Sequence, residues 1–160
     1  MSEELSYEIR FVTCDEWEEA MGLAWKTFLE FEGNVYPPEG VRSFEDFITD
    51  SSLKRMFIMG SYQMMAAFHD GKMVGMISLR NKTHISLLFV DRYYHRRGIG
   101  RALIDALSDY VKAEEGENKL TVNASPYGVE FYHCLGFQDI GPEKRQDGII
   151  FTPMFLSIEG

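Results

Sequence analysis

A short basic stretch with two glycines stands in the middle of an otherwise acidic chain. It runs His95-Arg96-Arg97-Gly98-Ile99-Gly100-Arg101, after an apolar run and before a helical pattern. The first N–H groups of a helix have no intrahelical partners, and the helix dipole adds positive potential, so such a turn binds phosphate groups. Glycines let the main chain approach an anion, and the arginines add fixed charge. The stretch therefore predicts an anion-binding turn.

Two common phosphate-binding motifs do not fit this turn. A P-loop ends in Gly-Lys-Ser/Thr, whereas this chain has Gly100-Arg101-Ala102. A dinucleotide fingerprint needs a third glycine where Leu103 stands, and it normally opens a domain instead of following several strands. The turn therefore predicts an anion site of another kind.

A second segment makes the prediction more specific. The run Phe131-Tyr132-His133-Cys134-Leu135-Gly136-Phe137 follows a short strand-like segment. With this pair of segments the chain resembles the GNAT superfamily of acetyltransferases, whose signatures are Gln/Arg-x-x-Gly-x-Gly/Ala and Phe-Tyr-x-x-Leu-Gly-Phe. The second signature matches completely. The first matches at Gly98 and Gly100 and departs at its opening position, where His95 stands.

The resemblance implies a cosubstrate, acetyl-CoA, and a set of residues that hold it. The diphosphate would bind at the turn, the pantetheine arm would pair with the edge of the preceding strand, and the N–H of Leu88 would face the thioester carbonyl as an oxyanion donor. The residues implied in cofactor binding are Leu88, Phe89, Val90, His95, Arg96, Arg97, Gly98, Ile99, Gly100, Arg101, Asn123 and Tyr132.

Two residues are candidates for proton transfer. Tyr132 matches the general acid of the family, which donates to the departing sulfur. An alkylamine acceptor has a pKa near 10 and must lose a proton before it attacks, so a base is also needed. His84 is the leading candidate, and strand alternation would place it on the same face as Ser86, Leu88 and Val90. Weaker candidates for the base are Asp91, Glu32 and Glu39.

The acceptor would bind beside the loop that follows the first helical pattern. Carboxylates and aromatic rings alternate there, and Glu32, Tyr36 and Phe44 could hold a cationic amine through charge and cation–π contacts. The same residues are equally typical of a capped loop with core aromatics. A non-catalytic module that binds or senses acyl-CoA is the alternative to an enzyme that acetylates a small-molecule or peptide amine.

The elements that must position these residues follow from hydrophobic periodicity and turn signals. An Asp70-Gly71 pair between two apolar runs predicts a hairpin. The predicted strands are 7–13, 62–68, 73–79, 84–90, 120–124 and 148–158, and the predicted helices are 14–32, 41–48, 98–116 and 128–135. This order predicts one α/β domain over residues 1–160, with a mixed sheet. The resemblance implies a mostly antiparallel GNAT sheet of about six or seven strands, a V-shaped splay between strands four and five, and helices on both faces.

Composition limits which molecules the protein is expected to bind and where in the cell it is expected to act. The chain has 16 basic and 25 acidic residues and a net charge of -9, which disfavours nucleic acid. Cys14 and Cys134 stand far apart, so neither a disulfide framework nor a metal site is indicated, and we expect a cytoplasmic protein. The N-terminus is polar and acidic, and we expect neither a signal peptide nor membrane insertion. The resemblance also allows a homodimer.

Overall fold

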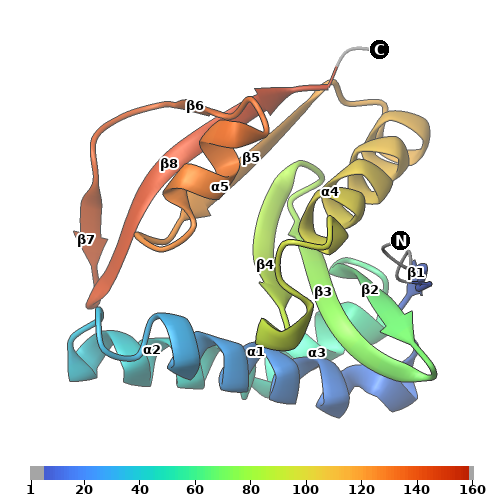
Figure 1. Cartoon of the computed structure of the whole chain (residues 1–160), viewed down its shortest axis with the longest axis horizontal. Helices are drawn as coiled ribbons and strands as arrows, with labels where there is room; N and C mark the ends of the chain where they lie inside the picture. Colours follow the sequence, from blue (N-terminus) through green and yellow to red (C-terminus); the bar gives the residue numbers. More distant parts are fainter. Residues whose placement is uncertain (1–5, 159–160) are drawn as a thin grey trace, which may run out of the picture.

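Eight strands form one twisted sheet in the computed structural model, which describes residues 6–158 (Figure 1). Their order is β1-β2-β3-β4-β5-β8-β6, with β7 paired to β8 beside this path. The strands are β1 (Glu8–Phe11), β2 (Gln63–His69), β3 (Lys72–Arg80), β4 (His84–Val90), β5 (Lys119–Ala124), β6 (Gln138–Asp139), β7 (Lys144–Gln146) and β8 (Ile149–Ser157). The predicted mixed sheet is confirmed, with two short strands, β6 and β7, that are too brief to show a sequence pattern. Residues 1–5, half of the segment considered for targeting, lie outside the described residues.

Strands β1 to β4 are antiparallel neighbours, and a tight turn fixes the register between β2 and β3. The predicted hairpin joins β2 to β3, and both Asp70 and Gly71 have positive φ angles, of 50° and 79°. Two such residues make the turn whose twist matches that of the flanking strands. The hairpin therefore sets the register of β3, against which β4 pairs.

Strands β4 and β5 run parallel and touch only at one end. The register pairs His84 with Thr121 and Ile85 with Val122, and beyond these two pairs the strands separate (Figure 1). A β-bulge starts at this point, because Ser78 of β3 pairs with Leu87 while Leu79 pairs with Ile85, which leaves Ser86 as the extra residue. Bulges bend and twist the strand that carries them. The predicted V-shaped splay is confirmed.

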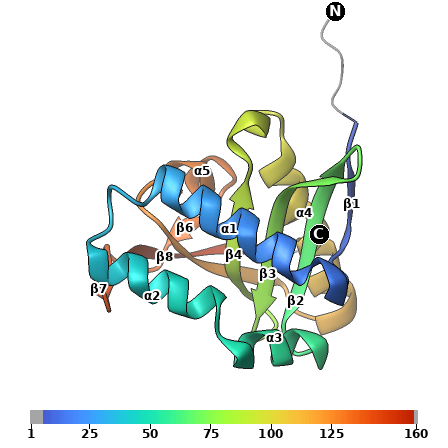
Figure 2. The same ribbon diagram turned by 90° about the horizontal axis from the view of Figure 1, so that it is seen from below.

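Five α-helices cover the two faces of the sheet. They are α1 (Trp17–Phe31), α2 (Pro38–Ile48), α3 (Ser51–Ile58), α4 (Ile99–Tyr110) and α5 (Val129–Cys134). One buried cluster joins α1, α2 and α3 to the sheet, and a second joins α4 and α5 to its other face (Figure 2). Helix α3 is absent from the sequence prediction. Asp50 starts it by accepting a hydrogen bond from the N–H of Ser52 at 2.8 Å.

The segment that joins α1 to α2 packs against the hairpin between β7 and β8. The hydroxyl of Tyr36 donates to the carbonyl oxygen of Ile150 at 2.8 Å, and the hydroxyl of Ser43 donates to that of Asp147 at 2.8 Å. Gly40 and Gly148 lie against each other so closely that a Cβ on either would collide with the backbone of the other. This contact closes one side of the splay. None of the described helices has the length and apolar character needed to cross a bilayer.

Candidate active site

A cavity of about 1060 Å³ lies in the splay between β4 and β5. Its walls come from α1, α2, the main chain of β4, the turn before α4, the loop after β5, helix α5 and the β7–β8 hairpin. The sequence-predicted residues that line it are Glu32, Tyr36, Glu39, Phe44, His84, Leu88, Phe89, Val90, His95, Arg96, Gly98, Ile99, Gly100, Arg101, Asn123 and Tyr132. Arg97 is exposed and is not among the lining residues. Residues far apart in the sequence thus meet in one cavity.

The main chain of β4 presents unpaired groups to this cavity. The N–H of Asp91 donates to the carbonyl of Val74 directly opposite, at 2.9 Å. Hydrogen-bonded and non-bonded pairs alternate along an antiparallel ladder. The pairs of Leu88 with Ile77 and of Val90 with Gly75 are therefore non-bonded, so the N–H and C=O groups of Leu88 and Val90 face the splay. The N–H and C=O groups of Phe89 face β3, so only the side chain of Phe89 can contribute to the cavity.

The bulge at Ser86 changes which side chains share a face of β4. Ile85 lies before the bulge and Leu88 after it, and both contribute to the cluster under α4. Ser86 instead bonds to Tyr62 in the cluster under α1, with the two hydroxyl oxygens 3.0 Å apart. The expectation that His84 shares a face with both Ser86 and Leu88 is wrong, because the extra residue inverts the alternation. His84 lies on the face opposite Ile85.

The basic turn has the backbone form of an anion cradle. Arg96 and Gly98 have positive φ angles of 61° and 80°, and Gly98 caps α4 with open space around the position of a Cβ. At Gly100 the need for glycine is steric. A Cβ there would lie 3.0 Å from the ring of Phe131 on α5. Arg96 and Arg101 form no ion pair or side-chain hydrogen bond with residues 6–158. Free guanidinium groups and unpartnered helix N–H groups suit a diphosphate.

The ring of His95 is held within the protein. Its Nε2 atom lies 2.6 Å from the carbonyl oxygen of Val90, which is one of the groups facing the splay. Phe31 stacks on the imidazole with ring centroids 4.8 Å apart, and Tyr127 packs on the other flank of Phe31 at 4.7 Å. Phe31 belongs to the segment expected beside the acceptor, whereas its contact with His95 and the presence of Tyr127 at the site had no sequence signal, because both depend on α1 and the loop after β5 meeting at the turn.

Tyr132 is buried beside the cavity between two aromatic rings. Phe131 and Phe137 contact it edge-to-face at 5.2 Å and 5.1 Å between centroids. Burial raises the pKa of the phenol, so it stays protonated at neutral pH. A protonated phenol can donate to a thiolate as it departs.

His84 is half-buried at the closed end of the splay. Its Nδ1 atom lies 2.9 Å from the hydroxyl oxygen of Thr121 on β5, which leaves Nε2 as the nitrogen available to a ligand. Burial lowers the pKa of the imidazole, and the positive charge of Arg80 lowers it further. A neutral imidazole is the form that accepts a proton. Asp91 forms an ion pair with Lys26 at 3.1 Å and does not line the cavity.

Glu32 carries a buried carboxylate into the cavity. Its side chain is 4% exposed, and its Oε2 atom has no hydrogen-bond partner among the described residues. Burial raises the pKa of this carboxyl, while hydrogen bonds from Ser125 and the backbone of Tyr127 oppose the rise. A buried acid with one open acceptor favours a ligand that brings a donor or a positive charge.

Tyr36 and Phe44 belong to the core as well as to the cavity wall. Phe44 stacks on Phe28 with centroids 4.0 Å apart, and Tyr36 contacts the same ring at 5.3 Å. Both side chains are buried. The interpretation of these residues as core aromatics is therefore confirmed, and both also line the cavity; their contact with a cationic amine stays a prediction.

Known proteins share this fold and these motifs. Residues 32–158 match the Acetyltransferase (GNAT) domain family. The uncharacterized N-acetyltransferase YafP of Escherichia coli K12 is 30% identical over 122 residues, which cover 76% of this chain and 75% of that protein. A GCN5-related N-acetyltransferase structure from Rhodopseudomonas palustris superposes with a TM-score of 0.83 at 23% identity, covering 98% of this chain and 99% of the other. The PaiA N-acetyltransferase of Thermoplasma acidophilum, solved in complex with coenzyme A, gives 0.78 at 20% identity, covering 95% and 99%.

The splayed sheet, the glycine turn before α4 and the Tyr132 segment together have the arrangement of a GNAT domain. The matches to the family and to a curated relative then make the assignment specific: this chain belongs to the GNAT acetyltransferase family. It is an acetyltransferase, and acetyl-CoA is its cosubstrate.

Proposed function

We propose that the enzyme transfers the acetyl group of acetyl-CoA to a primary amine by direct attack, without an acyl-enzyme. The observation that carries the proposal is that His84, Tyr132 and the free main-chain groups of Leu88 surround one cavity. Neither Cys14 nor Cys134 lines that cavity, and both are exposed, so no cysteine nucleophile stands beside the thioester position.

The cosubstrate would bind along the open side of β4. The N–H groups at the start of α4, with Arg96 and Arg101, would hold the diphosphate, and Asn123 of β5 would contact the pantetheine arm from across the splay. The N–H of Leu88 would donate to the thioester oxygen as negative charge develops there. His95 has no contact in this scheme, since its ring is already bonded to Val90.

The reaction needs one proton acceptor and one proton donor. Nε2 of His84 would take a proton from the ammonium, directly or through water, and the amine nitrogen would then bond to the acetyl carbon as the carbon–sulfur bond breaks. Tyr132 would donate its proton to the departing thiolate, and the nitrogen would lose its second proton to the resulting phenolate as the amide forms. Glu32 would hold the positive charge of the acceptor, between the aromatic side chains of Tyr36 and Phe44.

A Tyr132→Phe variant tests the proposal. We expect kcat to fall by about 100-fold, because a positioned general acid contributes roughly 10² to 10⁴, while the acetyl-CoA Kd measured by calorimetry stays unchanged. Tyr110→Phe is the matched control, because Tyr110 lies near the far end of α4 and bonds to Glu115.

Two outcomes would contradict the assignment. Unchanged turnover in Tyr132→Phe would remove the phenol from the mechanism. A wild-type protein that binds acetyl-CoA and releases no thiol with any amine would favour a non-catalytic sensing module.

A further inference from the structure

Two buried side-chain atoms in residues 6–158 lack a hydrogen-bond partner, and both belong to residues that line the cavity. They are Oε2 of Glu32 and Nε of Arg80. Buried polar atoms are almost always partnered in folded proteins, so each exception needs a reason. The two residues have opposite charges and do not pair with each other. Glu32 has a place in the proposed function, whereas Arg80 does not.

Arg80 lies beside the candidate base. It ends β3 and pairs in register with His84, the first residue of β4. Side chains at such directly opposed positions start about 5 Å apart. The charge of Arg80 acts on His84, whose pKa falls through burial and then through this arginine. A group bound to Arg80 would therefore lie close to the group that His84 deprotonates.

The protein leaves this guanidinium unpaired although acids are available. Glu39, Asp46 and Asp147 line the same cavity, yet Arg80 forms no ion pair with any of the described residues. Arginine cannot shed its charge, and its planar fork matches a carboxylate or a phosphate. Leaving a partly buried guanidinium without a partner costs stability in the ligand-free protein. Proteins typically keep such an unpaired group where a ligand supplies the missing hydrogen-bond partner.

We propose that Arg80 binds an anionic group on the acceptor, so that the substrate is a primary amine that also carries a carboxylate or a phosphate. This inference rests on the proposed function and names its substrate class. The amine would lie at His84 and the anion at Arg80, which requires only a short spacer between the two groups.

A panel of matched amines tests the inference and separates the two anions. The panel holds the standard L-amino acids, their methyl esters, short aminoalkyl phosphates and the corresponding alkylamines without an anionic group, with thiol release from acetyl-CoA as the assay. We expect at least one amine that carries an anion to exceed its counterpart without the anion by tenfold or more in kcat/KM. Carboxylates and phosphates occupy separate arms, so the preferred arm identifies the anion.

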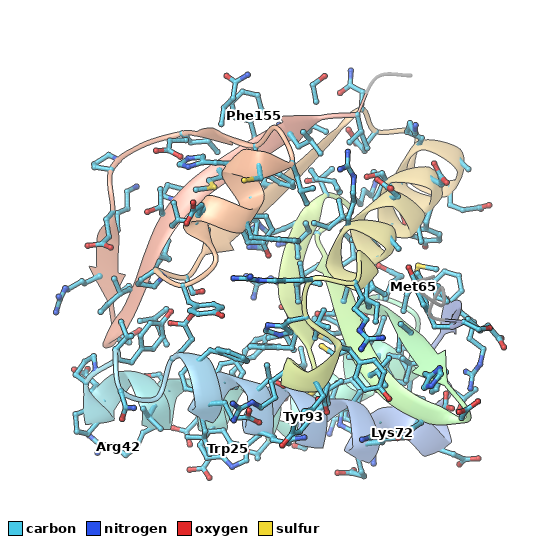
Figure 3. The ribbon with its side chains drawn as sticks, viewed as in Figure 1. Trp25, Arg42, Met65, Lys72, Tyr93 and Phe155 are labelled. Carbon is cyan, nitrogen blue, oxygen red and sulfur yellow. The ribbon has the colours of Figure 1, made fainter. Side chains whose placement is uncertain are left out.

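Variants assign the preference to Arg80. At a pH at which His84 is neutral in both proteins, Arg80→Met should raise KM for the acceptor with an anion by about 10- to 100-fold, as expected for a charged hydrogen bond worth about 1.5–3 kcal/mol, and leave KM for the counterpart without the anion unchanged. Arg80→Lys should recover part of the loss. Arg42→Met is the control, because Arg42 is exposed on α2 and lies away from the space between α2 and α5 (Figure 3). Equal losses for acceptors with and without the anionic group would overturn the proposal.

A binding experiment covers the case in which no amine in the panel reacts. The Nε–H resonance of Arg80, identified by its absence from Arg80→Met, should shift when the anionic amines are titrated into the protein. A shift without turnover would keep anion binding at Arg80 and remove the proposed transfer. A resonance that responds to none of them would overturn the inference, even where acetyl-CoA binds and amines without an anionic group react.

Discussion

The imidazole of His95 bonds to the carbonyl oxygen of Val90, with 2.6 Å between Nε2 and the oxygen. The ring thus occupies one of the main-chain acceptors that β4 turns toward the splay, and Phe31 packs over it. We expect an extended arm that pairs with this strand edge to compete with the ring for Val90. This expectation differs from the sequence motif, which implies that His95 contacts the cosubstrate.

The first prediction separates these two roles of His95. In His95→Ala the carbonyl of Val90 is free, and we expect acetyl-CoA to bind about fivefold more tightly, as one hydrogen bond worth about 1 kcal/mol would give. Calorimetry with acetyl-CoA measures the change. Weaker binding in the variant would restore His95 as a cofactor ligand.

The second prediction concerns the pH dependence of catalysis. A base must be neutral to act, so kcat/KM for the amine should rise with pH through the pKa of His84. Because burial and Arg80 lower that pKa below the ordinary value of 6.5, the rise should be complete at a lower pH than for a free imidazole. This rise is the acidic limb of the pH profile. His84→Gln should abolish the acidic limb and reduce kcat/KM by about 100-fold. A limb that persists in the variant would assign the base elsewhere.

Arg80 offers an independent check on that limb. Its positive charge disfavours a second charge on His84, so Arg80→Met should move the acidic limb toward higher pH. Arg42→Met should leave the limb in place. An unmoved limb in Arg80→Met would show that another group titrates.

The third prediction concerns the buried carboxylate of Glu32. Since its folded-state pKa is raised, the protein favours the protonated form, and the ionised form destabilises the fold as pH rises above the ordinary value of 4.5. Glu32→Gln should therefore unfold at a higher temperature than the wild type at pH 7.5, and the difference should shrink toward pH 4. The variant should also raise KM for a cationic acceptor by about tenfold through loss of a charged contact. A difference in unfolding temperature between Glu32→Gln and the wild type that does not change with pH would contradict the argument that burial raises the pKa of Glu32.

The fourth prediction concerns the contact that closes the cavity wall. Gly40→Ala places a methyl group against the backbone of Gly148, and we expect a loss of about 1–3 kcal/mol in the free energy of unfolding, as for overpacking elsewhere. Gly22→Ala is the control, because Gly22 lies within α1 with open space around its Cβ position. There the change should stabilise the helix by up to about 1 kcal/mol. Urea unfolding compares the two variants, and equal effects would contradict the close contact.

The sequence alone determined the features that depend on local chemistry. The Asp70-Gly71 hairpin, the glycine turn before α4 and the Tyr132 segment were all predictable, because turn residues and short motifs act within a few positions of the chain. The V-shaped splay followed from the resemblance these motifs carry. Long periodic elements were predicted, whereas α3, β6 and β7 were too short to show a period.

Only the tertiary structure decided which of these residues meet and which way they face. The bulge at Ser86 inverts the alternation of β4, and a one-residue insertion leaves no period that a sequence can reveal. The bond from His95 to Val90 and the unpaired state of Arg80 depend on contacts between separate segments. Packing sets those contacts, since a side chain finds its partners by position in space and not by its type or spacing along the chain.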